Sequence, residues 1–241
     1  MVSMWTKKQS STFKTPNYSK EYLRKPEILK LLGNLKGKKL LEIGSGSGYW
    51  TRFFAKKGAT CYGVELEKNQ IKISIDEELR KPLGIKYYNR NATNLKCFKN
   101  NSFDIVFLEY VLIEISKLSD VQRIFNESFR VLKKGGKIYI SDMHPFDPLC
   151  HPQNFEYEKK FNYFSSGEKI YTKALQLDGK FIKFKDYHWT LEDYFNTLTN
   201  AGFLISTFKE PRPSIQLIKK IPYLAYRKNL VKDVMIVGNK F

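Results

Sequence analysis

Cysteine and histidine are both scarce in this chain of 241 residues, which contains three of each. The cysteines, Cys61, Cys97 and Cys150, form no C-x-x-C pair, and an odd number cannot close a disulfide framework. No charged start followed by an apolar core is visible, so no signal peptide is expected. The longest apolar run, residues 105–115, contains two glutamates and is too short to cross a bilayer. We therefore expect a protein without a membrane span in the reducing cytoplasm.

Acidic residues are few relative to basic ones, 24 against 42, which gives a formal net charge of +18. The excess lies at the two ends: residues 1–40 carry +8 and residues 209–241 carry +6, whereas residues 41–208 carry +4. Basic ends can attract nucleic acid or anionic lipid over long range. A lysine-rich surface that is merely well solvated is the interpretation we favour, so nucleic acid is only the second candidate partner, after a small molecule.

Short apolar segments alternate with amphipathic segments from residue 39 onward. Strands are predicted at 39–43, 60–65, 85–88, 104–108, 137–141, 203–208 and 234–237, and helices at 47–57, 68–80, 120–133 and 191–200. Strands that alternate with helices favour a parallel sheet covered on both sides. The predicted fold is α/β, with a doubly wound, mostly parallel seven-stranded sheet and helices on both faces.

The alternation stops between residues 143 and 189. Two strand-like segments, 170–177 and 180–187, flank Asp178-Gly179, which is a strong hairpin signal. An inserted antiparallel cap is therefore expected. The edge of such a hairpin can pair two subunits or stay within one chain, so an oligomer formed through the cap is left open. The predicted organisation is an N-terminal lid or arm (1–38), a cofactor-binding core (39–142), the substrate cap (143–189) and the completion of the core (190–241).

Three glycines follow the first predicted strand, at positions 44, 46 and 48. Glycine allows backbone conformations that a Cβ forbids and lets a ligand approach the main chain. In an open parallel sheet the ligand crevice lies at the carboxyl ends of the strands, where this loop falls. Tyr49 stands where the dinucleotide fingerprint G-x-G-x-x-G needs glycine, so a pyrophosphate is not the favoured ligand.

The ends of the next two strands indicate a nucleoside ligand. Glu65 ends the second strand, where a carboxylate can accept hydrogen bonds from both ribose hydroxyls. Asn91 and Ala92 follow the third strand, where an amide side chain and backbone groups can read an adenine edge. Together these positions predict an adenosine without phosphates.

The same residues resemble the class I S-adenosylmethionine-dependent methyltransferases, in particular those that act on small molecules. The resemblance covers most of residues 20–142 and extends more loosely beyond them. Five motifs in order with fitting spacing make it specific, and it implies S-adenosyl-L-methionine as the cofactor. The motifs are the acidic glycine loop EIGSGSG (42–48), GVE (63–65), NA (91–92) where the family usually has Asp-Ala, SFDIV with VL (102–106 and 111–112), and RVLKKGG (130–136).

The resemblance also implies roles within the cofactor site. The methionine part is expected to lie against Gly44, Ser45 and Gly46. Glu42 is expected to be tied to it directly or through water, and Glu65 to hold the ribose. The other expected members are Leu66 packing on the adenine, Asn91 and Ala92 beside it, Leu108 and Glu109 at the sulfonium end, and Tyr22 in a lid over the methionine tail.

All three histidines fall between the end of the fifth strand and the end of the cap. Methyl transfer is an in-line displacement, so the protein mainly aligns the acceptor and, for a hydroxyl or ammonium, removes a proton. His144 is the first candidate for a general base or substrate anchor, and His188 is the second. The alternative is that each only satisfies a loop hydrogen bond. No metal is expected, since Asp142 is the one well-placed carboxylate.

The predicted activity is methyl transfer to an oxygen or nitrogen atom of a small molecule. Aromatic residues of the cap form either an apolar wall for that substrate or the core of the cap itself. The second candidate is an RNA or DNA methyltransferase that uses the basic termini, although FLEY (107–110) differs from the N/D-P-P-Y/F signature that holds a flipped base. The third is a catalytically inactive cofactor-binding protein.

Overall fold

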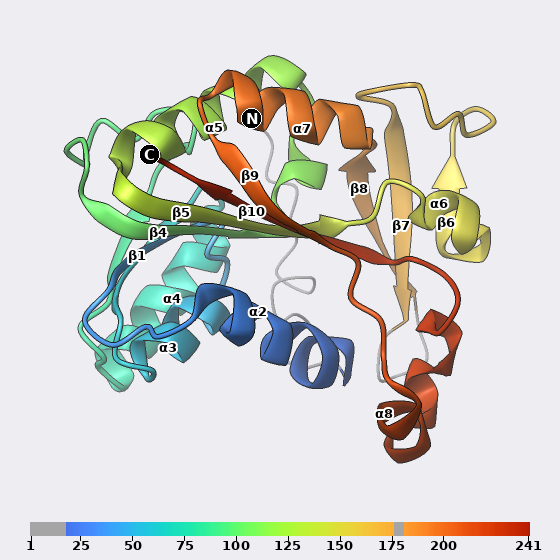
Figure 1. Ribbon diagram of the computed structural model, residues 1–241, viewed down its shortest axis with the longest axis horizontal. Helices are drawn as coiled ribbons and strands as arrows, with labels where there is room; N and C mark the ends of the chain where they lie inside the picture. The colour runs from blue at the N-terminus through green and yellow to red at the C-terminus, as the bar shows by residue number, and fades with distance from the viewer. Residues whose placement is uncertain (1–17, 176–180) are drawn as a thin grey trace.

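The computed structural model describes residues 18–175 and 181–241, with a large sheet between two layers of helices and a smaller sheet beside them (Figure 1). The order of the large sheet is β3-β2-β1-β4-β5-β10-β9. Strands β1 to β5 pair in parallel, whereas β10 is antiparallel to both β5 and β9. The predicted fold class is thereby confirmed. The strand bounds are β1 Lys39–Ile43, β2 Thr60–Glu65, β3 Lys86–Asn89, β4 Phe103–Glu109, β5 Leu132–Met143, β9 Leu204–Lys209 and β10 Asp233–Asn239.

Helices cover both faces of this sheet because its central strands are apolar on both sides. In β1, Leu40 is buried in a cluster with Trp50 and Phe54, whereas Leu41 is buried in a second cluster with Phe125. Burying each such side chain contributes roughly 1.5–3 kcal/mol. On the first face lie α2 (Lys25–Leu32), α3 (Tyr49–Ala55) and α4 (Lys68–Arg80), and on the second lie α5 (Leu118–Val131) and α7 (Leu191–Asn200) (Figure 1).

Local signals set the boundaries of several elements. Helix α3 begins at Tyr49 rather than at residue 47, because Gly48 takes φ +85° as its N-cap. Helix α7 begins after Thr190, which forms a capping box with Asp193. Strand β5 begins at Leu132, so the glycine pair expected to precede it lies within it.

The predicted antiparallel cap is present as a second sheet of order β6-β7-β8. Its strands are β6 (Phe155–Tyr157), β7 (Lys169–Leu175) and β8 (Phe181–Tyr187), and both pairs are antiparallel. The predicted turn at Asp178-Gly179 lies outside the described residues. Between β5 and this sheet are the short helix α6 (Asp147–Cys150) and the 3-10 turn η3 (Pro152–Asn154).

Helices that the sequence pattern does not predict flank the carboxyl ends of the strands. The N-terminal arm contains the π-helix η1 (Ser19–Arg24), which runs directly into α2. The 3-10 turn η2 (Leu112–Glu114) follows β4, and α8 (Ile215–Lys220) and the 3-10 helix η4 (Pro222–Arg227) precede β10. Within residues 18–175 and 181–241, no helix combines the length and apolar character needed to cross a membrane.

Candidate functional site

A large cavity of ≈ 1570 Å³ lies at the carboxyl ends of the parallel strands. Its walls include the loop after β1, the end of β2, the loop after β3, the end of β4, the N-terminal arm and the cap. This is where ligands bind in open parallel sheets. Nine of the eleven residues predicted to bind the cofactor line it: Glu42, Gly44, Ser45, Gly46, Glu65, Leu66, Asn91, Ala92 and Glu109.

The loop after β1 is held in a conformation that only glycine adopts easily. Gly44 has φ +69°, and a Cβ built on it would lie 2.5 Å from Cγ2 of Val111. The backbone N–H of Gly44 donates to the Val64 carbonyl at 2.8 Å, which ties the loop to β2. A side chain at this position would both strain the backbone and displace the wall of the cavity.

Glu65 locks the same loop from the end of β2. Its Oε2 accepts from Gly46 N–H at 2.8 Å and its Oε1 from Glu67 N–H at 2.7 Å. Burial raises the pKa of Glu65, although these two N–H groups oppose the rise because they favour the charged form. A carboxylate accepts more hydrogen bonds than these two, so Glu65 can position the loop and still accept from a ligand hydroxyl.

Two further polar groups beside the loop are buried. Glu42, only 3% exposed, accepts a hydrogen bond from the Thr51 hydroxyl. Burial raises the pKa of Glu42 well above its usual range. The Ser45 hydroxyl is also buried and has no hydrogen-bond partner within the described part of the chain. Buried polar atoms are normally paired, so the Ser45 hydroxyl is available to a polar ligand.

Arg24 from the N-terminal arm faces Glu109 at the end of β4, a contact that the sequence motifs do not reveal. Its Nη1 lies 3.4 Å from Oε1 of Glu109, and its guanidinium stacks 4.7 Å from the centre of the Tyr110 ring. Neither atom of the 3.4 Å pair is hydrogen-bonded within residues 18–175 and 181–241. Burial raises the pKa of Glu109, and Arg24 opposes that rise. Arg24 and Glu109 therefore both line the cavity, and each has an atom that can still form a hydrogen bond with a ligand.

The remaining predicted cofactor residues differ in position. Leu66 is 46% exposed at the rim of the cavity. Asn91 lines the cavity, but its Oδ1 already accepts from the backbone N–H and the hydroxyl of Thr93. Leu108 is fully buried in the core beneath the site, and Tyr22 is 45% exposed on the arm. Neither of these last two is among the residues that line the cavity.

Both histidines predicted to be catalytic are buried away from the cavity lining. The backbone N–H of Phe146 donates to Nδ1 of His144, whose Nε2 lies 3.0 Å from Oε1 of Glu210. His188 donates from Nε2 to the Tyr163 carbonyl at 2.7 Å. Burial lowers the pKa of both rings. These contacts match the alternative in which each histidine satisfies a local hydrogen bond.

The third histidine, His151, does line the cavity. It lies at the end of α6, where Nδ1 is 2.5 Å from Oδ1 of Asp147. The other oxygen of Asp147 accepts from Lys232 Nζ at 2.9 Å. Burial raises the pKa of Asp147, while Lys232 and His151 oppose the rise. Lys232 and His151 thus favour the charged form of this fully buried carboxyl group.

Several of the seven cap aromatic residues considered as a substrate wall pack against one another. The Phe146 and Tyr163 rings stack with centroids 4.4 Å apart, and Phe161 contacts the His188 ring edge to face. None of the seven aromatic residues considered as a substrate wall lines the cavity: Phe146, Phe155, Tyr157, Phe161, Tyr163, Phe164 and Trp189. Phe155, Tyr157 and Phe161 belong to the core of the cap, whereas Phe184 and Tyr187 of the cap line the cavity.

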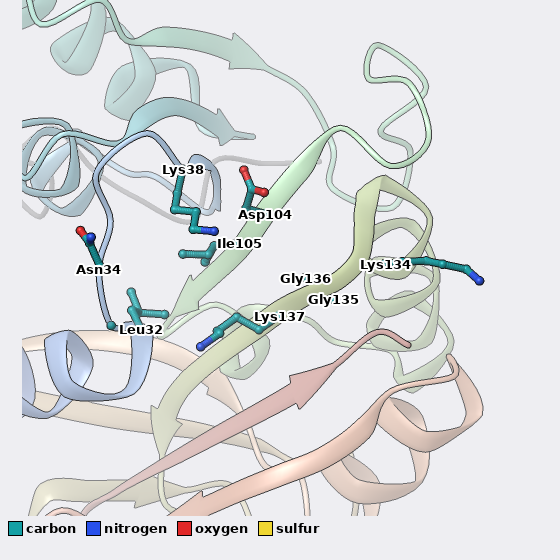
Figure 2. Close-up of a pocket in the computed structure, with 10 residues that line it drawn as sticks. Leu32, Asn34, Lys38, Asp104, Ile105, Lys134, Gly135, Gly136 and Lys137 are labelled. Atoms are coloured by element: carbon teal, nitrogen blue, oxygen red, sulfur yellow. The ribbon is translucent and has the colours of Figure 1, made fainter.

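A second cavity of ≈ 520 Å³ lies at the opposite edge of the sheet, where β4 begins (Figure 2). Lys38, Lys134 and Lys137 line it, but Figure 2 shows Lys134 pointing away from the other two. The carboxylate of Asp104 in this cavity is occupied by the Lys39 N–H and by Lys133. None of the predicted site residues belongs to it, so the larger cavity is the candidate functional site.

Known proteins resemble this chain both in sequence and in fold. Residues 41–140 match the family described as a methyltransferase domain. The demethylmenaquinone methyltransferase of Lactococcus lactis subsp. lactis is 27% identical over 213 residues, which cover 80% of this chain and 77% of that protein. Phosphoethanolamine N-methyltransferase 1 of Zea mays is 28% identical over 155 residues, which cover 63% of this chain and 29% of that protein.

A solved structure extends the similarity beyond the matched domain. The S-adenosylmethionine-dependent methyltransferase from Mesorhizobium loti superposes with a TM-score of 0.71 at 20% sequence identity. The superposition covers 89% of this chain and 96% of that one. The common fold therefore extends well beyond residues 41–140.

Proposed function

We propose that this chain is a class I S-adenosylmethionine-dependent methyltransferase and that it methylates a small molecule at an oxygen or nitrogen atom. The observation that carries the proposal is the extent of the cavity. It runs from the glycine loop after β1 to the cap, and its ≈ 1570 Å³ exceed the ordinary size of a site for one drug-sized ligand, roughly 300–1,000 Å³. A methyl donor and a compact acceptor can therefore occupy it together.

The residues around the glycine loop suit S-adenosylmethionine. Gly46 leaves open space, since a Cβ there would have Oε1 of Gln70 at 4.0 Å as its nearest neighbour. The buried Ser45 hydroxyl and Glu109 Oε1 suit the polar methionine end. We propose that Gly46 and Glu42 also contact this end. When bound, the cofactor supplies a methyl group on a sulfonium, whose departing thioether needs no further activation.

The nucleoside end belongs, in this proposal, to the far side of the same loop. Glu65 accepts from the ribose, while Leu66, Asn91 and Ala92 flank the adenine. Because its Oδ1 already accepts from Thr93, Asn91 acts through its amide nitrogen. Leu108 supports the sulfonium end from beneath, and Tyr22 stays a predicted part of the lid without a contact to the cavity.

The acceptor end is the region where the strand ends meet the cap. Met143, at the end of β5, and Asp233, at the start of β10, line the cavity beside Glu109. The two relatives named above act on demethylmenaquinone and phosphoethanolamine, which are both small molecules. That supports a small acceptor without selecting its chemical class.

Acceptor fractions test this proposal. The purified protein is incubated with S-adenosylmethionine and either a cell filtrate freed of macromolecules or purified tRNA, and formation of the demethylated product is measured. We expect turnover with the filtrate only. Turnover with tRNA alone would overturn the small-molecule assignment, and binding of the cofactor without turnover in any fraction would favour the inactive alternative. The proposed location is the cytoplasm, and an oligomer formed through the cap sheet stays a prediction.

A further inference from the structure

His151 and Asp147 form a hydrogen-bonded pair at the acceptor end of the cavity. His151 is 3% exposed and Asp147 is fully buried. The carboxylate of Asp147 accepts from Lys232 Nζ as well as facing His151 Nδ1. A carboxylate can only accept hydrogen bonds, so the proton of the neutral imidazole resides on Nδ1. The lone pair of the ring is then on Nε2.

Nε2 of His151 is the atom that distinguishes this pair from an ordinary structural contact. It is buried and has no hydrogen-bond partner in the described parts of the chain, although His151 lines the cavity. A buried ring nitrogen without a partner is unusual in a folded protein. A donor from a bound molecule would satisfy it.

A series of contacts links the histidine pair to the end where methyl transfer is proposed. Asp233 pairs with Met143 in the large sheet, and Tyr110, which follows Glu109, donates to Asp233. Lys232, next to Asp233 in the chain, holds Asp147. The histidine pair is therefore connected by direct contacts to the strand ends that flank the predicted sulfonium position.

In the other two histidines the proton is on the other ring nitrogen, Nε2. Nδ1 of His144 accepts from a backbone N–H, which leaves its proton on Nε2. His188 donates from Nε2 to a backbone carbonyl, so its proton is also on Nε2. Among the three histidines, His151 alone combines an Nδ1 proton with a lone pair on a nitrogen in a cavity-lining residue.

We propose that His151, oriented by Asp147, is the general base that deprotonates a phenolic hydroxyl of the acceptor. This inference rests on the proposed function. Nε2 takes the hydroxyl proton while the oxygen forms a bond to the methyl carbon, the carbon–sulfur bond breaks, and its electron pair remains on sulfur. Asp147 stabilises the imidazolium that results, as an acidic partner does in other histidine bases.

The surroundings of His151 favour an aromatic acceptor. The ring of Tyr226 meets the His151 ring edge to face with centroids 5.6 Å apart, and Tyr223 contacts Tyr226 at 5.8 Å. Both tyrosines line the cavity and remain 39% and 63% exposed, so their ring surfaces are open to a ligand. Aromatic rings pair in such offset or edge-to-face arrangements, which is why the proposal specifies a phenol.

The first test needs no acceptor and no turnover. With only three histidines in the chain, ¹⁵N-histidine NMR resolves the tautomer of each ring. We expect one Nδ1–H ring, and we expect its signals to disappear in His151→Gln and to change in Asp147→Asn. Cys150→Ser, on the same short helix but outside the cavity lining, is the matched control and should preserve them. An Nε2–H tautomer for His151 would overturn the proposal.

The second test separates proton removal from folding. Phenol keeps its proton near pH 7.5, like the tyrosine side chain, whereas 4-nitrophenol is largely ionised there and needs no base. Replacing His151 by Gln should lower turnover of phenol about a hundredfold or more and leave turnover of 4-nitrophenol within about threefold. Equal losses for both phenols, or an equal phenol-selective loss in His144→Gln, would contradict the assignment.

Failure of this inference differs from failure of the proposed function. If the wild-type protein binds S-adenosylhomocysteine but methylates neither phenol, the phenolic acceptor is wrong and the methyltransferase assignment stands. If it does not bind S-adenosylhomocysteine, the proposed function itself fails.

Discussion

At the scale of single residues, Glu65 has two tasks, because it holds the glycine loop and is proposed to hold the ribose. Glu65→Gln keeps the shape but removes the charge. Hydrogen bonds to charged groups contribute about 1.5–3 kcal/mol, so we expect S-adenosylhomocysteine to bind roughly ten- to a hundredfold more weakly. Titration calorimetry measures this. Glu77→Gln, which removes a partly exposed acid paired with Arg80 on α4, should leave the affinity unchanged.

A substitution at Gly44 tests how closely the loop after β1 approaches the Val111 side chain. Gly44→Ala meets both a positive φ and the Val111 side chain at 2.5 Å, whereas Gly37→Ala meets a similar φ of +74° with nothing within 4 Å. We expect about 1 kcal/mol of lost stability for the control and about 2–4 kcal/mol for Gly44→Ala in urea unfolding. Equal losses of stability in the two variants would show that the Val111 side chain moves aside at no cost.

Site residues that belong to a local sequence motif could be predicted from the sequence. Site residues that meet only in the folded structure could not. Motif order and strand ends predicted that the glycine loop, Glu65 and Glu109 lie together, and they line the same cavity. Arg24 and His151 were not predicted as site residues. Their contacts, with Glu109 and Asp147, form only in the folded structure. His144 was placed correctly after β5, but the turn there directs its ring towards Glu210.

At the scale of elements, Asp142 fastens the turn after β4 to β5. This buried carboxyl accepts from Leu112 N–H at 3.0 Å and from Met143 N–H at 2.9 Å. Burial raises the pKa of Asp142 to about 8. In the unfolded chain its pKa is about 3.9, so between these values the folded state binds the extra proton. The stability contributed by Asp142 is full below about pH 4 and is lost as pH rises towards 8.

Replacing Asp142 by Asn should therefore reduce the pH dependence of the free energy of unfolding. We expect the wild-type free energy of unfolding, relative to Asp142→Asn, to fall between pH 5 and 8 by up to about 1.4 kcal/mol per pH unit, the slope for one proton. Urea unfolding at several pH values measures the difference. A difference that stays constant, or that grows with pH, would show that Asp142 is not protonated in the folded protein.

Elements with a clear period were predictable from sequence, and those formed by packing were not. Helix α4 matches its predicted bounds because a continuous helical pattern follows the β2 signal. Helices η1 and η4 were missed, since they are short and are held by distant contacts. Buried Arg227 of η4, for example, donates both to Ser19 of η1 and to Asp233 of β10.

At the scale of the whole molecule, the net charge of +18 favours long-range attraction of nucleic acid. If it is only nonspecific attraction, tRNA binding should weaken by about a thousandfold or more between roughly 50 and 200 mM salt. We also expect tRNA to be unmethylated throughout that range. Binding that persists at high salt and is accompanied by methylation would return nucleic acid to first place among the candidate substrates.

The central claim is that the cavity at the carboxyl ends of the strands binds S-adenosylmethionine, with Glu65 on its ribose. Titration calorimetry of the purified protein with S-adenosylmethionine, S-adenosylhomocysteine and NADH tests it most directly. We expect one-to-one binding of the first two, weakened by Glu65→Gln, and no binding of NADH. Heat from NADH alone, with neither sulfur nucleoside bound, would contradict it.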